Sequence, residues 1–210
     1  VTFSARGVSV TLDLTIGHIA DFAVEAADRI LRPLHRAPWI GEAEESLPPT
    51  LPAGTRGLSG DFFCAPFSAN DIETAPIHGW PANSRWLPLS SEAISGGWQA
   101  RFRLERTVLG ATVEKTLTLR DGHPFLYQEH TMIGGSGELP VAHHPMTVMQ
   151  AGGRLAFSPK RLVLSPDAAL ETDPARGRVA LAYPGEATDL TAFPRGDGGR
   201  YDLTRYPADG

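Results

Sequence analysis

Two histidines, each close to prolines, are the side chains of this chain best suited to move protons. His78 lies in the sequence PIHGWP between Pro76 and Pro81, and His144 directly precedes Pro145. Proline fixes its own φ and pushes the residue before it towards extended geometry, so we expect both imidazoles on short, stiff segments. An imidazole gives or takes a proton near neutral pH, and a carboxylate near it completes the apparatus for moving protons across a small polar substrate.

The segment around His78, residues 60–86, contains the side chains that a sugar site uses. It combines aromatic rings with carboxylates and an amide, namely Phe62, Phe63, Phe67, Asn70, Asp71, Glu73, Trp80 and Trp86. Sugars stack their C–H faces on aromatic rings, and their hydroxyls need hydrogen-bond donors and acceptors. We interpret the segment as a ligand-binding loop. The alternative is a well-packed irregular connection in which His78 is a structural hydrogen-bonding residue.

Other kinds of site find no support in the sequence. The seven histidines lack the spacing of a zinc site, so we expect no metal. The adjacent His143 and His144 would point to opposite faces of a strand, so only one of them can face a given pocket. The chain has no G-x-S-x-G, no phosphate-binding loop of the G-x-x-x-x-G-K type and no dinucleotide-binding G-x-G-x-x-G after a strand.

Charge and cysteine content exclude further classes of function. A net charge of −5 leaves no basic surplus to neutralise phosphates, so nucleic acid is not an expected partner. No apolar run approaches the length of a membrane span, and we expect no membrane insertion. The first ten residues lack the charged-then-apolar pattern of a secretory signal, and the single Cys64 suits a reducing compartment. We therefore expect a cytoplasmic protein.

The alternation of apolar and polar residues predicts an all-β fold. Residues 7–16 and 18–25 alternate as half-buried strands, and a third run covers residues 29–34; a short helix over residues 20–31 is the alternative. Residues 35–59, with four prolines, are expected to form a long loop, and residues 61–66 a short strand.

The clearest pattern covers residues 97–134. It predicts three antiparallel strands, with a hairpin turn at Asp121-Gly122. Two short strand candidates follow at residues 154–157 and 161–164, and no closing strand is expected after residue 193. We predict one large sandwich domain over residues 1–210.

In order and spacing, these segments resemble the aldose 1-epimerases, the galactose mutarotase-like proteins. The resemblance lies in GHIADFAVEAADRILRPLHRAPW at 17–39, GDFFCAPFSANDIE at 60–73, IHGWPANSRW at 77–86 and VAHHPM at 141–146, and it covers about residues 8–165. It implies an antiparallel β-supersandwich with a sugar cleft on one broad face. The C-terminal part of the family domain finds no match in the chain.

The family's chemistry implies roles for particular residues. The histidine before proline, here His144, would be the general acid on the ring oxygen, and the histidine before glycine, here His78, would assist and hydrogen-bond the sugar. A glutamate would take the proton from the anomeric hydroxyl. The ring then opens, the C1–C2 bond rotates and the ring closes again as the other anomer, without a cofactor. The other residues expected to bind the substrate are Asn70, Asp71, Trp80 and Arg85.

Two departures from the family pattern keep other hypotheses open. No segment matches the family's glutamate, and Ser68 to Asn70 hold the place of a sugar-binding arginine, for which either Arg85 or Arg36 is a candidate substitute. The leading hypothesis is an enzyme that interconverts the anomers of an aldose. The alternatives are a carbohydrate-binding or sensing protein on the same fold without turnover, and a structural sandwich domain of a larger carbohydrate-active enzyme.

Overall fold

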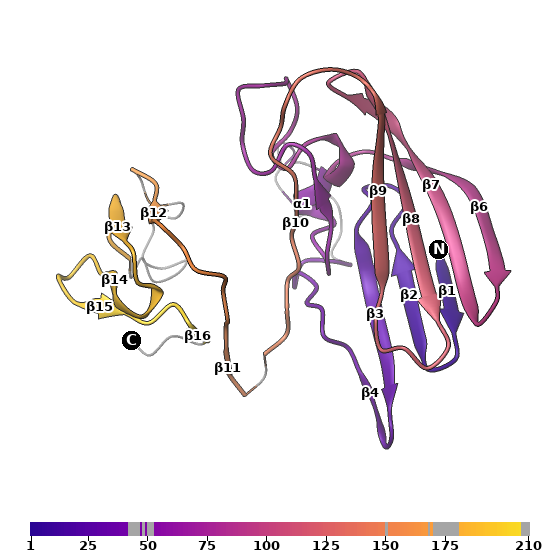
Figure 1. The fold of residues 1–210 in the computed structure, drawn as a ribbon, viewed down its shortest axis with the longest axis horizontal. Helices are drawn as coiled ribbons and strands as arrows, with labels where there is room; N and C mark the ends of the chain where they lie inside the picture. The colour runs from indigo at the N-terminus through magenta and orange to yellow at the C-terminus, as the bar shows by residue number, and fades with distance from the viewer. Residues whose placement is uncertain are drawn as a thin grey trace. The chain divides into compact units, whose positions relative to one another are not determined.

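The computed structural model describes residues 1–41, 47, 49, 53–149, 151–167, 169 and 181–206 of the chain. Its contacts divide the chain into two compact units, Val1–Val148 and Met149–Gly210, where the sequence analysis expects one domain. Each unit is described by itself. The regular structure of both is mainly antiparallel strand, which confirms the all-β class (Figure 1). The described residues form no helix with the length and apolar character needed to cross a membrane.

The first sheet of the first unit has four antiparallel strands in sequence order. They are β1 (Thr2–Ala5), β2 (Val8–Leu12), β3 (Ile19–Ala26) and β4 (Arg29–Leu31). The buried and partly exposed residues of β2 alternate, as the sequence pattern predicts. The strands expected within residues 7–34 are confirmed, and the alternative of a helix over residues 20–31 is wrong because β3 and β4 occupy that range.

The second sheet is a four-stranded antiparallel meander. It contains β6 (Trp86–Ile94), β7 (Gly97–Val108), β8 (Ala111–Arg120) and β9 (Tyr127–Gly134). The three strands predicted within residues 97–134 are confirmed. Strand β6 escapes sequence analysis because Pro88 interrupts its pattern, and the register of its pairing with β7 shifts between Pro88 and Ser90. A proline is tolerated there because β6 is an edge strand.

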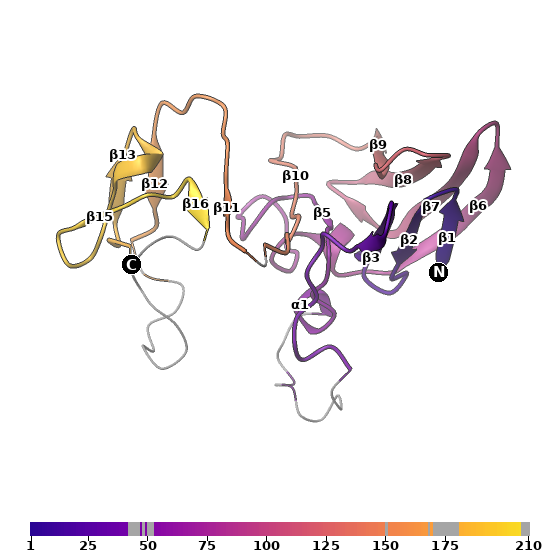
Figure 2. The ribbon, with the colours of Figure 1, turned by 90° about the horizontal axis from the view of Figure 1, so that it is seen from below.

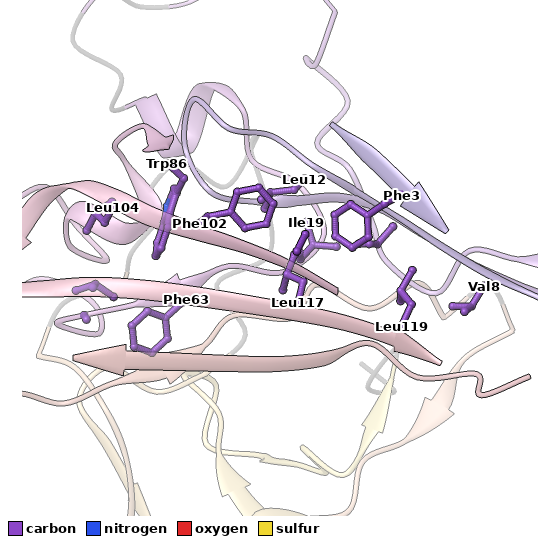
Figure 3. Close-up of a cluster of buried hydrophobic side chains, with 14 of the residues drawn as sticks. Phe3, Val8, Leu12, Ile19, Phe63, Trp86, Phe102, Leu104, Leu117 and Leu119 are labelled. Atoms are coloured by element: carbon purple, nitrogen blue, oxygen red, sulfur yellow. The ribbon is translucent and has the colours of Figure 1, made fainter. Parts of the chain in front are cut away.

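The two sheets of the first unit lie face to face and enclose its main hydrophobic core (Figures 1 and 2). Apolar side chains from both sheets meet between the layers, as the positions of Phe3, Leu12, Phe102 and Leu117 show (Figure 3). Burial of such side chains is the main driving force for folding. This packing of one sheet on the other makes the first unit a β-sandwich.

Three short elements lie on the connection from β4 to β6, and a fourth follows β9. They are α1 (Ala53–Arg56), β5 (Phe63–Cys64), the 3₁₀ helix η2 (Trp80–Ala82) and β10 (Ala142–His143). β5 and β10 pair as an antiparallel ladder that joins Phe63 to His143, so two segments far apart in the sequence become neighbours. The strand expected at residues 61–66 is confirmed, although it is shorter. Part of the loop expected at 35–59 lies outside the described residues, and α1 falls within that range.

The second unit consists of short paired strands. They are β11 (Gly153–Arg154), β12 (Val163–Ser165), β13 (Gly185–Ala187), β14 (Phe193–Pro194), β15 (Arg200–Tyr201) and β16 (Arg205–Tyr206), with the 3₁₀ helix η3 (Leu190–Ala192). The expectation of no strand after residue 193 is wrong. β14 pairs with β15 around a turn in which the Asp197 carboxylate accepts hydrogen bonds from Arg195 and from the backbone N–H of Gly199.

Candidate functional site

His78 and His144, far apart in the sequence, lie next to each other in the structure. Their ring centroids are 5.1 Å apart and the rings meet edge to face. Both line a cavity of about 160 Å³ in the first unit. The described residues that line it are His18, Gly54, Thr55, Leu58, Phe62, Ile77, His78, Ala82, Asn83 and His144. The cavity combines an apolar wall with several imidazoles.

His144 is positioned by the pairing of β10 with β5. Its backbone N–H donates to the carbonyl of Phe62 at 3.0 Å, just past the paired residues Phe63 and His143. The imidazole stacks on the ring of Phe62, with centroids 4.8 Å apart and planes only 10° from parallel. Backbone and ring contacts with one residue therefore fix both the position and the tilt of the imidazole.

His78 occupies a tight left-handed turn. Its φ is +69°, and that of Gly79 is +76°. A Cβ on Gly79 would lie 2.0 Å from the carbonyl oxygen of Ala65, so no other residue fits at this close approach. The glycine that the sequence analysis associates with a close backbone contact has that role here. The turn is closed by the N–H of Gly79, which donates to the Pro76 carbonyl at 2.8 Å, and the N–H of His78 donates to the Ser68 carbonyl at 3.0 Å.

The hydrogen bonds of His78 fix its tautomer. The backbone N–H of Ser68 donates to Nδ1 at 3.3 Å, so this nitrogen is an acceptor and the proton of the neutral ring is on Nε2. Burial lowers the pKa of His78, and the neighbouring His144 lowers it further. Both effects favour a neutral imidazole that presents one N–H donor.

His18 is a cavity residue that the sequence analysis missed. It is fully buried just before β3, and its ring stacks on Phe62 with centroids 4.2 Å apart. Its Nε2 lies 3.0 Å from the carbonyl oxygen of Ala82. Burial lowers the pKa of His18 to about 4. No sequence motif indicates this residue, because it lies at the start of an ordinary alternating strand.

Two of the expected substrate-binding residues, Asn70 and Asp71, do not belong to the described lining of the cavity. The side-chain oxygen of Asn70 accepts hydrogen bonds from the backbone N–H groups of Ile72 and Glu73, each at 2.9 Å. Asn70 therefore shapes its own loop, as asparagines in turns commonly do. Asp71 is exposed in the same loop.

The other two, Trp80 and Arg85, also lie outside the described lining. Trp80 packs against the main core, and the guanidinium of Arg106 lies 4.8 Å from the centre of its ring. Arg85 is exposed. The cavity instead uses Asn83, whose amide donates to the carbonyls of Ile77 and Gly79 and so holds the His78 turn.

A second polar cluster lies on the other side of the β5–β10 ladder. Nδ1 of His143 is 2.9 Å from Oδ2 of Asp61, and Gln128 donates to the same oxygen at 2.6 Å. His130 stacks on Phe63, with centroids 4.0 Å apart. The expectation that His143 and His144 face opposite sides is confirmed, because His143 contacts this cluster and His144 the cavity.

Asp61 and Lys115 bring charge into the sandwich. Burial alone would raise the pKa of Asp61, but hydrogen bonds from His143 and Gln128 hold it below its ordinary value. Lys115 is 1% exposed, and its Nζ donates to the Gly17 carbonyl at 2.6 Å. Burial lowers the pKa of Lys115 to about 7. Among the described residues, no group of three histidines, cysteines or carboxylates could hold a metal ion.

Comparisons with family models, with curated proteins and with solved structures found no match to this chain. The likeness to aldose 1-epimerases therefore rests on the sequence motifs, and it stays a prediction. The structure brings the histidines of the two motifs into one cavity.

Proposed function

We propose that the chain binds a small aldose in the cavity beside His78 and His144 and interconverts its α and β anomers. The observation that carries this proposal is the 5.1 Å separation of the two imidazole rings on the wall of one cavity. The sequence motifs suggested these residues separately, as the histidine before glycine and the histidine before proline. The apolar wall of the cavity suits the C–H faces of a sugar.

In the proposed reaction, His144 donates a proton to the ring oxygen of the sugar. The bond between C1 and the ring oxygen breaks, the anomeric hydroxyl passes its proton to a water molecule, and the open-chain aldehyde forms. After rotation about C1–C2, the same steps in reverse close the ring on the other face and return both protons. The neutral His78, with its proton on Nε2, hydrogen-bonds a sugar oxygen and holds the ring against His144.

The second candidate function is sugar binding without turnover. The hydrogen bond from Ser68 and the lowered pKa of His78 both favour this histidine as a fixed donor rather than a proton acceptor. Of the carboxylates near the two motifs, Glu73 accepts a hydrogen bond from the backbone N–H of Leu109, and Asp71 and Glu129 are exposed. All three lie outside the described lining of the cavity.

Polarimetry on freshly dissolved α-D-glucose and α-D-galactose tests the proposal. The chain should accelerate mutarotation, and His144→Gln should reduce this acceleration at least about 100-fold, the usual effect of removing a general acid. His143→Gln is the matched control, because it changes the adjacent imidazole on the opposite side of β10. Circular dichroism checks that both variants fold.

The outcomes separate the two candidate functions. Conversion by His144→Gln at the parent rate would show that the role assigned to His144 is wrong. Sugar binding in a titration, without any acceleration by the parent chain, would favour the binding protein over the enzyme.

A further inference from the structure

His18 brings a third imidazole to the cavity, and its hydrogen bonding determines what it can offer a ligand. Nε2 lies 3.0 Å from the Ala82 carbonyl, which can only accept, so the ring proton is on Nε2 and donates to that oxygen. Nδ1 then carries a free lone pair. This nitrogen is buried and has no hydrogen-bond partner among the described residues. His18 itself is fully buried and lines the cavity.

His18 is held neutral by its surroundings. Burial lowers its pKa to about 4, and the positive charge of Lys115 acts in the same direction. The Gly57 carbonyl lies near the ring and raises the pKa slightly, but hydrogen-bond geometry is met only on the Ala82 side. At neutral pH the imidazole therefore presents a hydrogen-bond acceptor without a charge.

The rest of the cavity wall also suits an uncharged ligand. Leu58, Phe62, Ile77 and Ala82 supply apolar surface, and His78 supplies a neutral N–H donor. Apart from His144, which the proposed reaction uses as its proton donor, the wall offers apolar surface and neutral donors and acceptors, so an ion entering the site loses its hydration for little electrostatic return. A molecule with hydroxyls and C–H faces loses much less.

We propose that His18 is a substrate-binding residue, whose Nδ1 accepts a hydrogen bond from one hydroxyl of an uncharged aldose. This inference rests on the proposed function, since it takes the ligand of the cavity to be a sugar. The stack on Phe62, with planes 13° from parallel, holds the imidazole in place before the sugar arrives. A preorganised acceptor of this kind selects for the position of a hydroxyl.

The test is a titration of D-glucose and D-galactose into the intact chain, followed by NMR. His18→Gln keeps an amide N–H that can donate towards the Ala82 carbonyl but moves the acceptor from the position of Nδ1 to that of Oε1, and it should weaken binding about 10-fold. His130→Gln is the matched control. His130 is a buried imidazole stacked on Phe63 at 4.0 Å, but it lies outside the described lining of the cavity. Its replacement should leave the affinity unchanged.

A measurement on the unaltered chain keeps the inference testable even where His18→Gln fails to fold. The ¹⁵N resonances of the imidazoles should show His18 protonated on Nε2 in the free chain. Addition of sugar should shift the Nδ1 resonance of His18 in the direction of hydrogen-bond acceptance. A proton on Nδ1, or an Nδ1 resonance that saturating sugar leaves in place, would overturn the proposal.

Titration with deoxy sugars identifies the sugar hydroxyl that donates to Nδ1 of His18. One monodeoxy analogue should bind the parent chain about 10-fold more weakly than the full sugar, yet bind His18→Gln as well as the full sugar does. D-Glucose 6-phosphate should bind more weakly than D-glucose, and tighter binding of the phosphate would overturn the uncharged class of ligand.

The failure of this inference differs from that of the proposed function. If His18→Gln binds the sugar with the same affinity as the parent chain, the role of His18 is refuted and the proposed function stands. A parent chain that binds none of the sugars would refute both.

Discussion

Replacing Lys115 with methionine should stabilise the folded chain at pH 6 and below, and the advantage should reverse at high pH. Lys115 lies on β8 at one of the positions that face the core, in line with Val113 and Leu117, and it is 1% exposed. Its ammonium lies 4.5 Å from the centre of the Trp86 ring and donates to the Gly17 carbonyl at 2.6 Å. These contacts replace only part of the hydration that the charge loses on folding.

The size of the effect follows from the pKa. Burial lowers the pKa of Lys115 from 10.5 to about 7, against the opposing attraction of Asp61. The difference is roughly 3.5 pH units at about 1.4 kcal/mol each, so the charged form costs on the order of 5 kcal/mol of folding free energy. Methionine avoids this cost but leaves the Gly17 carbonyl unpaired, at about 1–3 kcal/mol. The variant should gain roughly 2–4 kcal/mol below pH 7.

The sign reverses because the proton is lost at different pH values in the two states. Between pH 7 and 10.5 the unfolded chain holds the Lys115 proton and the folded chain does not, so the stability of the parent rises with pH. Below pH 7 both states are protonated and the full cost is present. Above 10.5 neither state is protonated, and the parent keeps the hydrogen bond that methionine lacks.

Urea unfolding at several pH values between 6 and 10 checks this prediction. The four tryptophans, at 39, 80, 86 and 98, all belong to the first unit, so their fluorescence reports its unfolding. The stability of the variant relative to the parent should fall by about 1.4 kcal/mol per pH unit above pH 7. Lys160→Met, at the exposed Lys160 of the second unit, should show no such slope. A Lys115→Met difference that does not depend on pH would refute the reasoning.

Two further substitutions test the site. Gly79→Ala should lower the free energy of unfolding by about 1–3 kcal/mol and abolish sugar binding, because the φ of Gly79 is +76° and a Cβ would meet a backbone carbonyl. Gly96→Ala is the control, because φ is +69° there and the space around it is open, so it measures the backbone strain alone. The same unfolding and titration experiments apply to both variants. Asp61→Asn should lower the free energy of unfolding by about 1–3 kcal/mol at neutral pH, because it weakens the hydrogen bond to His143. The pKa of Asp61 is lowered in the folded chain, so this difference in stability should fade below pH 4, where acid protonates the carboxyl of the parent. Equal destabilisation at pH 7 and pH 3 would contradict this role of Asp61.

Regular alternation made most of the sandwich predictable. β2 and β7 each have one apolar face, and the alternation of their residues in the sequence indicates that face directly. β6 was missed because Pro88 lies at a bulge that the pattern cannot show. The strand candidates at 154–157 and 161–164 overlap β11 and β12, but the strands at residues 185–206 were missed because runs of two or three residues are too short to display a period.

The pairing of His78 with His144 was predictable because both motifs carry local signals, a glycine and prolines that imply constrained backbone. Asn70 and Trp80 were assigned to the site by proximity in sequence. The structure shows that one caps its own loop and the other packs on the core. Proximity along an irregular loop does not determine which side chains share a face, because such a loop has no period.

The buried polar cluster is visible in the sequence as a polar residue at a position where the alternation predicts an apolar one. On β8 the core-facing positions read Val113, Lys115, Leu117 and Leu119, so a lysine stands where the period requires an apolar residue. On β9, His130 pairs with Lys115 and extends the same exception to the next strand. A single inward polar side chain suggests an error of register, but a lysine and a histidine at paired positions predict a buried polar network. That network holds Asp61 and His143 beside the ladder, and the next residue, His144, enters the cavity from this ladder.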